Sequence, residues 1–278
     1  MIFSITELGA IINKSLVKAL DILDQFNPEK PSLSLSEISQ NTGFPKSTVH
    51  SILSTFLLKG YVEQIENGRY ALGKKIIILT RSVMVNTDIR DRAAPYLRKL
   101  AGNCGQSVYL TCRYQGKLLY IYAIESESRL LARTAVGDLV PLHCTANGKS
   151  IAAFLPECER KELFDQSPLP AFTPYTITSY GDLEKELCEV RQKGFALDRQ
   201  EHELGTYCLG TPIFGSDSKI IGACSISGQD EEIIKSKMEE FSTLLITTAQ
   251  EISWRMGYVP SHPSMIATVS AKGFSNRE

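Results

Sequence analysis

The sequence predicts a multidomain α/β protein, with a winged helix-turn-helix at the N-terminus, a linker helix, and a mixed α/β domain behind it. Three observations carry this prediction. The chain has 278 residues, which is long for a single small domain. Residues 14–72 have the apolar spacing of three helices, followed by two short strand-like runs around Asn67-Gly68. From residue 107 onward, strand-like runs alternate with helical ones, so the second domain contains both.

The helices of the first module begin and end at recognisable signals. Residues 14–26, "KSLVKALDILDQF", have one apolar stripe at helical spacing. In "SLSEISQNTG", Ser34 stands three residues before Glu37, the spacing of a capping box. Pro45 is suited to the first turn of the next helix, "PKSTVHSILSTFLLKG", which Gly60 ends. Helix, helix, short turn, helix and hairpin in this order indicate a winged helix-turn-helix.

The third helix has the composition of a DNA-reading helix. No acidic residue occurs between Glu37 and Glu63, and hydroxyl side chains are frequent there. An acid-free helix N-terminus attracts phosphate oxygens. We therefore predict double-stranded DNA as a partner, with Arg69 reaching it from the wing and five helix residues entering the major groove: Lys46, Ser47, Thr48, His50 and Ser51. The alternative is a three-helix module that binds protein, with serine and threonine as caps.

The pattern returns to helix between residues 74 and 103, where Asp88 is a candidate start and Pro95 a candidate kink. We expect two helices or one kinked helix there. The first part is apolar on more than one side, as in a linker helix packed against a partner.

The second domain shows a longer series of elements. "SVYLTCRYQGKLLYIYAIES" reads as two strands around Gln115-Gly116, and "RLLARTAV" as another. "PLHCTANGKSIAAFLP" indicates a loop entering a helix, and "GDLEKELCEVRQKG" a helix ending at Gly194. "FALDRQ", "YCLGTPIFG" and "IIGACSISG" read as further strands, followed by a helix over about 229–257. The last residues have no period and indicate a poorly ordered tail.

The stretch "ALDRQEHELGTYCLG" brings a carboxylate, an imidazole and a thiol together in Asp198, His202 and Cys208. A hydrolase would need Cys208 in a nucleophile elbow, but it stands in a strand-like run. A zinc site from His143, Cys144, His202 and Cys208 is possible by residue type but lacks ligand spacing. We therefore expect no catalytic residue, no metal and no cofactor, and a loop role for His202.

The bulk composition limits the remaining classes. The net charge is −1, so any DNA binding depends on a local surface. The seven cysteines form no C-x-x-C pair, no signal peptide precedes them, and no run of eighteen apolar residues occurs. We expect a cytoplasmic protein with reduced thiols and no membrane association.

Two sets of segments resemble a known family. "LSLSEISQNTGFPKSTVHSILSTFLLKGYVEQ" and "GRYALGKKI" are similar to the DNA-binding half of the IclR family of bacterial transcription regulators. "GDLVPLHCTANGKSIAAF", "TITSYGDLEKELCEVRQKGFALDRQEHELGTYCLGTPIF" and "IIGACSISG" resemble its effector-binding half. The resemblance runs from about residue 14 to 257 and implies a GAF-like α/β effector domain and a homodimer or dimer of dimers. It implies these bounds: DNA-binding domain 1–73, linker helix 74–88, effector domain 89–258 and tail 259–278.

The resemblance also implies a pocket for a small carboxylate. Its parts are the backbone of the "TANGK" loop, an Asp and a Cys ten residues apart, and two serines on the following strand. The matching residues here are Ala146, Asn147, Asp198, Cys208, Ser225 and Ser227. Many relatives carry a small residue in place of Asn147, so this amide either hydrogen-bonds the ligand or narrows the pocket.

Structural alternatives remain for several of these residues. Asp198 could be a surface carboxylate near Arg199, and the two serines could form a half-exposed strand face. Lys149 could be a solvated helix residue or an anion ligand.

Together these features predict a DNA-binding transcription regulator, in the first instance a repressor, that is not an enzyme. Its effector would be a small carboxylate, a keto acid or a sugar acid. "TITS", "DRQEHELG" and "EISWRMGY" resemble regulators of sugar-acid catabolism that answer to 2-keto-3-deoxygluconate. Two alternatives are a regulator whose C-terminal domain only oligomerises, and an enzyme for small acids with a helical appendage.

Overall fold

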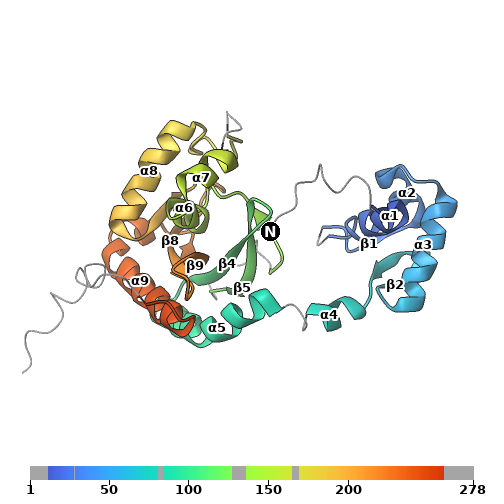
Figure 1. The fold of residues 1–278 in the computed structure, drawn as a ribbon, viewed down its shortest axis with the longest axis horizontal. Coiled ribbons are helices and arrows are strands. Elements are labelled where there is room, and N and C mark those ends of the chain that lie inside the picture. Colours follow the sequence, from blue (N-terminus) through green and yellow to red (C-terminus); the bar gives the residue numbers. More distant parts are fainter. Residues whose placement is uncertain (1–11, 28, 81–83, 127–135, 165–168, 260–278) are drawn as a thin grey trace, which may run out of the picture. The chain divides into compact units, whose positions relative to one another are not determined.

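The computed structural model describes residues 12–27, 29–80, 84–126, 136–164 and 169–259 (Figure 1). The chain divides into two compact units between Met84 and Val85. This division lies within the segment predicted as a linker helix. Apart from Val259, the predicted tail lies outside the described residues.

The N-terminal unit is a winged helix-turn-helix, as predicted. Its sheet has the strand order β1-β3-β2. The elements, in chain order, are α1 (Lys14–Leu23), β1 (Ser32–Leu33), α2 (Leu35–Thr42), α3 (Lys46–Lys59), β2 (Val62–Gln64), β3 (Tyr70–Leu72) and α4 (Lys75–Thr80). The strand β1, whose two residues pair with β3, was not predicted.

Local chemistry explains the helix ends of this unit. Ser34 N–H donates to Glu37 Oε2 at 2.7 Å, and Glu37 N–H donates to Ser34 Oγ at 3.3 Å, which completes the predicted capping box. Pro45 is the N-cap of α3 and lies just outside its first turn. Asn67 and Gly68 both have positive φ, as the tight turn of the wing requires.

The segment after the wing is arranged differently from the prediction. α4 ends at Thr80, and α5 runs from Met84 to Cys104 with Pro95 inside it. Asp88 therefore lies within a helix and does not start one. Pro95 removes one backbone hydrogen bond, which this long helix tolerates.

The C-terminal unit is built on a six-stranded antiparallel sheet of order β6-β5-β4-β9-β8-β7. Its strands are β4 (Ser107–Tyr114), β5 (Lys117–Ile124), β6 (Leu139–Val140), β7 (Ala196–Arg199), β8 (Tyr207–Phe214) and β9 (Ile220–Gly228). Its other helices are α6 (Ala146–Ala153), α7 (Glu157–Phe164), α8 (Tyr180–Lys193), the 3-10 turn η2 (Glu231–Ile234) and α9 (Met238–Arg255). The α/β class is thereby confirmed.

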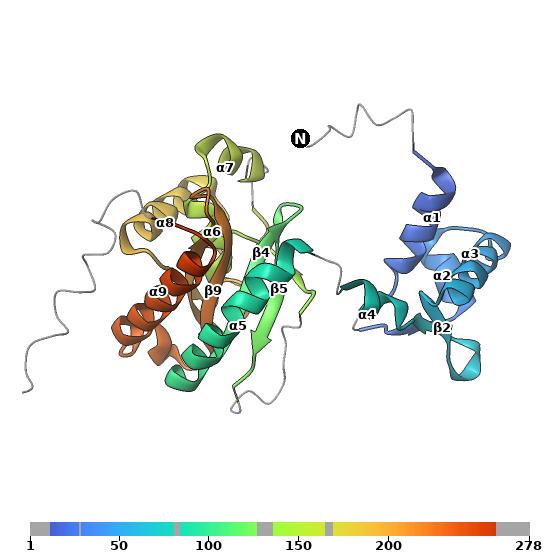
Figure 2. The ribbon, with the colours of Figure 1, turned by 60° about the horizontal axis from the view of Figure 1, so that its bottom comes forward.

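Helices cover both faces of this sheet (Figure 2). α5 and α9 pack on one face over a core that includes Cys224 and Ile226 of β9. α6, α7 and α8 pack on the other face, over a core that includes Ala223. Because side chains alternate along a strand, Ser225 and Ser227 lie on the α6 face.

Two other expectations for this unit need correction. The final helix was predicted from about residue 229 but starts at Met238, because Asp230 caps the separate turn η2. The helix α7 was not predicted. The strand candidate "RLLARTAV" lies outside the described residues except for Val136.

Candidate ligand pocket and DNA-binding helix

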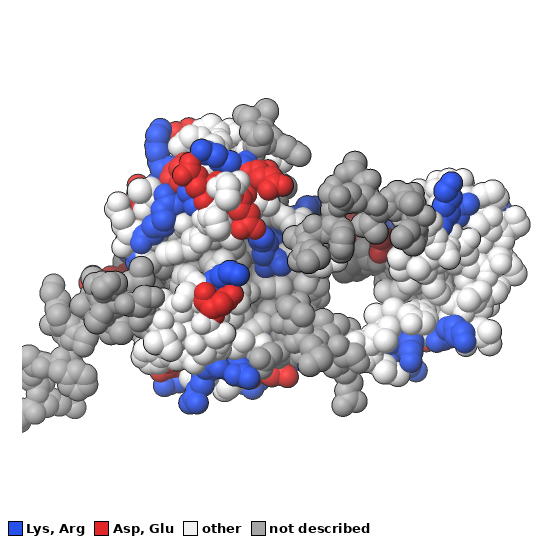
Figure 3. Space-filling view, viewed as in Figure 1, with Lys and Arg blue, Asp and Glu red and all other residues white. Residues whose placement is uncertain are grey.

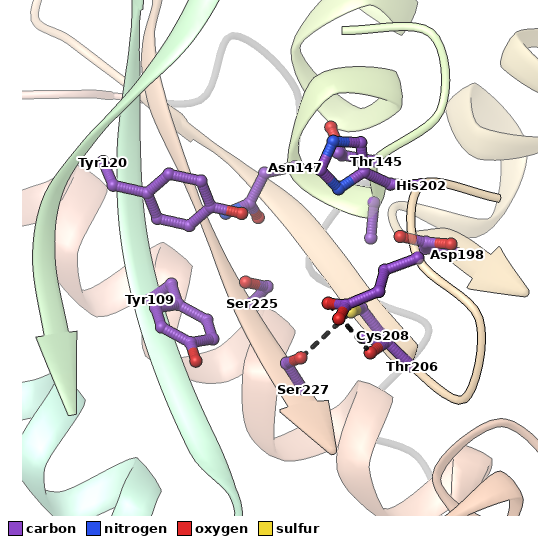
Figure 4. Close-up of a pocket in the computed structure, with 12 residues that line it drawn as sticks. Tyr109, Tyr120, Thr145, Asn147, Asp198, His202, Thr206, Cys208, Ser225 and Ser227 are labelled. Atoms are coloured by element: carbon purple, nitrogen blue, oxygen red, sulfur yellow. Dashed lines mark hydrogen bonds between the residues drawn. The ribbon is translucent and has the colours of Figure 1, made fainter. Parts of the chain in front are cut away.

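The strand register places the polar residues of three neighbouring strands side by side. Asp198 of β7 pairs with Cys208 of β8, and Cys208 pairs with Ser227 of β9. The Cys208 thiol donates a hydrogen bond to Ser227 Oγ at 3.1 Å (Figure 4). The ten-residue spacing of Asp198 and Cys208 is thus a cross-strand pair.

The first turn of α6 lies against this row of side chains. Thr145 caps the helix by accepting a hydrogen bond from Gly148 N–H at 3.2 Å. Gly210 of β8 allows the close approach, because a Cβ there would lie 2.5 Å from the Ala146 carbonyl carbon and 2.7 Å from Asn147 N. The backbone of Ala146 and Asn147, at the start of the helix, therefore lies beside the strands.

All six residues expected to bind the effector line one cavity of about 450 Å³, part of which is open to solvent. They are Ala146, Asn147, Asp198, Cys208, Ser225 and Ser227. The two serines are buried among these groups, so the alternative of a half-exposed strand face is wrong.

Six further residues line the cavity and were not assigned to it from the sequence: Tyr109, Tyr120, Thr145, His202, Glu203 and Thr206. Tyr109 pairs with Ser225 across β4 and β9, and its ring meets that of Tyr120 edge to face at 5.4 Å. Alternation along "SVYLTCRY" could have marked Tyr109, but only the strand order reveals its neighbours.

His202 belongs to the cavity wall as well as to a loop. Its ring lies 5.3 Å from that of Phe172. Burial lowers the pKa of His202, and the neighbouring His143 lowers it further. The imidazole is therefore neutral at pH 7 and offers one donor and one acceptor.

Asp198 is a buried carboxyl and not a surface residue near Arg199, so that alternative is wrong. It is 3% exposed, and its Oδ1 accepts a hydrogen bond from Glu201 N–H at 2.7 Å. Burial, reinforced by the Glu201 carboxylate, raises the pKa of Asp198 to about 7. The side chain can therefore meet a ligand as either a donor or an acceptor near neutral pH.

Lys149 is neither solvated nor among the residues that line the cavity, so both sequence alternatives are wrong. Its side chain is fully buried, with Nζ 2.6 Å from Glu201 Oε1 and 3.1 Å from Glu186 Oε1. Arg199 is paired with Glu186 at 3.1 Å. Lys149 thus connects α6 to the chain segment that carries His202 and Glu203.

Asn147 is the most unusual group of the pocket. It is 2% exposed, and neither Nδ2 nor Oδ1 has a hydrogen-bond partner among the described residues. Buried amides are almost always paired, so this one points to a ligand.

The Cys208 thiol donates a hydrogen bond to Ser227. Burial raises the pKa of Cys144, which keeps that thiol protonated. Among the residues that the structure describes, no group of three histidine, cysteine or acidic side chains is placed to hold a metal ion. Within the same residues, no helix has the length and apolar character needed to span a membrane.

In the N-terminal unit, α3 presents most of its predicted DNA-contacting residues to solvent. Lys46, Ser47, His50 and Ser51 are exposed, and Thr48 is half-buried. No side chain caps the helix start. On the face seen in Figure 3, this unit carries mainly uncharged and basic side chains.

Arg69 has intramolecular partners. Its guanidinium donates to Ser32 O at 2.7 Å and Ser32 Oγ at 3.1 Å, and it forms an ion pair with Glu37 at 3.1 Å. Hydrogen bonds from Ser34, together with Arg69, lower the pKa of Glu37 to about 2. Arg69 therefore links the wing to α2. Its contact with DNA stays a prediction.

Comparison with known proteins gives the family. The IclR helix-turn-helix domain matches residues 15–66, and the bacterial transcriptional regulator IclR C-terminal domain matches residues 81–254. The HTH-type transcriptional regulator XynR of Escherichia coli (strain K12) is 34% identical over 248 residues, covering 89% of this chain and 98% of XynR. The transcriptional repressor IclR of the same organism is 28% identical over 247 residues, covering 88% and 90%.

The fold agrees with a solved relative. The crystal structure of the Thermotoga maritima IclR has a TM-score of 0.73 and 34% identity, covering 88% of this chain and 99% of that one. These relatives are transcription regulators and not enzymes. The chain belongs to the IclR family of bacterial transcription regulators.

Proposed function

We propose that this regulator is a repressor whose affinity for its operator changes when a small organic acid enters the pocket described above. The observation that carries the proposal is the convergence of α6, β7, β8 and β9 on one polar cavity. The proposal assigns DNA binding to residues 1–73, linkage to 74–88 and effector binding to 89–258, with 259–278 as a tail.

The chemistry of the cavity supports an acid with further oxygen atoms. The backbone N–H groups at the start of α6 suit a carboxylate. Asp198, Ser225 and Ser227 suit hydroxyl or keto oxygens. Of the described residues that line the cavity, none is Lys or Arg, so a single negative charge fits better than two.

The N-terminal unit supports operator recognition. Lys46, Ser47, His50 and Ser51 of α3 are exposed, whereas Val49 and Leu53 of the same helix are buried in the core. In a homodimer or dimer of dimers, two such helices would read the two halves of a pseudo-palindrome. A ligand shifts that binding only through its different affinity for the two arrangements of the protein.

The test is fluorescence anisotropy with labelled DNA from upstream of the protein's own gene, with and without a panel of keto acids and aldonic acids. The proposal expects salt-dependent binding that at least one acid changes, and the loss of that response in Asp198→Asn while DNA binding persists. If DNA binds but no acid alters its affinity or raises the melting temperature, the C-terminal unit only oligomerises. If no DNA binds at low salt, the regulatory proposal itself is wrong.

A further inference from the structure

Asn147 occupies a position where an unpaired amide is costly. Asn147 contributes both its backbone N–H and its side chain to the first turn of α6, and it lines the cavity. Figure 4 shows the side chain extending from α6 toward the side of the cavity where Tyr120 and Ser225 lie. A buried amide without partners costs on the order of 1–3 kcal/mol. Such a cost is retained where a ligand supplies the missing bonds.

The unmet bonds are of two kinds. Nδ2 has no acceptor and Oδ1 has no donor among the described residues. A carboxylate or keto oxygen can only accept, so it can satisfy Nδ2 and leaves Oδ1 unpaired. A hydroxyl group both donates and accepts. Two hydroxyl groups on adjacent carbons match the two ends of one planar amide, with one donating to Oδ1 and the other accepting from Nδ2.

The neighbours of Asn147 favour hydroxyl groups as well. Asp198 and Glu203 contribute carboxyl groups to the cavity, and Ser225 and Ser227 contribute hydroxyls. An ionised carboxylate only accepts, so it pairs with a ligand donor such as a hydroxyl. An apolar or purely keto-substituted chain offers no donor to these carboxyl groups, so a hydroxylated chain is bound more favourably.

We propose that Asn147 makes this pocket selective for acids that carry two hydroxyl groups on adjacent carbons, as aldonic acids do. Simple keto acids and aliphatic acids of equal length are bound more weakly. The inference rests on the proposed function, because it assumes that the cavity binds an organic acid.

The experiment measures dissociation constants by calorimetry for the full chain. The probes are D-gluconate, D-mannonate and D-galactonate, compared with 2-oxohexanoate and hexanoate, which have the same number of carbons. The variants are Asn147→Leu, which keeps the approximate volume and removes both polar atoms, and Asn147→Ala. The matched control is Asn103→Ala, which removes an exposed amide from α5.

For the wild type we expect at least one aldonate to bind ten- to a hundredfold more tightly than 2-oxohexanoate, as two hydrogen bonds imply. Asn147→Leu and Asn147→Ala should lower this ratio by about fivefold or more, because the aldonate loses two hydrogen bonds while the neighbouring carboxyl groups keep a smaller preference for hydroxyl groups. Asn103→Ala should leave it unchanged. Far-UV circular dichroism checks folding, and if Asn147→Leu does not fold, Asn147→Ala decides.

Two failures are distinguishable. If the wild type binds these acids without preferring aldonates, or if the variants keep the wild-type preference undiminished, the inference about Asn147 is overturned and the proposed function stands. If the wild type binds none of these acids, and no acid in the wider panel raises the melting temperature, the effector role of the pocket is refuted together with this inference.

Discussion

Replacing Lys149 by methionine should destabilise the C-terminal unit strongly. The side chain is fully buried, and its ammonium group lies 2.6 Å from Glu201, whose side chain is 4% exposed. Glu186 retains Arg199 in the variant, but Glu201 loses its ion-pair partner, and its Oε2 already lacks a hydrogen bond among the described residues. Breaking a buried pair from one side costs about 3–5 kcal/mol.

Urea unfolding followed by tryptophan fluorescence measures this cost. Trp254 is the single tryptophan of the chain and lies on α9, so its emission reports on the C-terminal unit. With a slope of roughly 2 kcal/mol per M, the midpoint should fall by about 1.5–2.5 M. The control is Lys193→Met, since Lys193 pairs with Glu189 at 2.7 Å with both side chains about half exposed. That change should cost less than about 1 kcal/mol.

A double variant separates charge from packing. Adding Glu201→Gln to Lys149→Met removes the unpaired charge and should restore about half of the lost stability or more. Two results would contradict this expectation. One is a free energy of unfolding for Lys149→Met within about 1 kcal/mol of that for Lys193→Met. The other is a double variant that is less stable than Lys149→Met.

Three other outcomes follow from the structure. The raised pKa of Asp198 contributes stability that is present at pH 4 and lost as the pH rises through about 7. Relative to Asp198→Asn, the wild type should therefore lose on the order of 2–4 kcal/mol of unfolding free energy between pH 4 and 8, and a constant difference in urea titrations would contradict this. Lys46→Ala should weaken operator binding and make the negative slope of log K against log salt shallower by about 0.9. An unchanged slope in anisotropy titrations would exclude a phosphate contact by Lys46. Gly210→Ala should cost more than about 2 kcal/mol and abolish acid binding, because backbone atoms of α6 lie 2.5 Å from the added Cβ. The control Gly181→Ala meets no atom within 4 Å, and equal melting temperatures for these two variants would contradict the expectation.

Local signals were sufficient to predict most helices and strands, whereas the residues of the pocket came from the family resemblance. The capping box at Ser34 and the turn at Asn67-Gly68 depend only on neighbours in the chain, and both occur as predicted. Family resemblance identified Asp198 and Cys208, and the hairpin register brings them together.

Long-range packing explains what the sequence did not reveal. Tyr109 reaches the cavity because β4 lies beside β9, an order that no local pattern encodes. Lysine is usually a surface residue, but Lys149 is buried because it forms ion pairs with Glu186 and Glu201, which are distant in sequence. His202, which is partly buried, likewise contacts Phe172, which lies 30 positions earlier in the chain.

The alternation along β9 has an evolutionary consequence. Ser225 and Ser227 face the cavity, while Cys224 and Ile226 fill the core beneath α5 and α9. Inserting or deleting one residue in this strand would exchange the two faces, placing hydroxyls in the core and apolar groups in the cavity. Point substitutions at the two serines can therefore change the ligand preference during evolution, whereas changes in the length of the strand would disrupt the core.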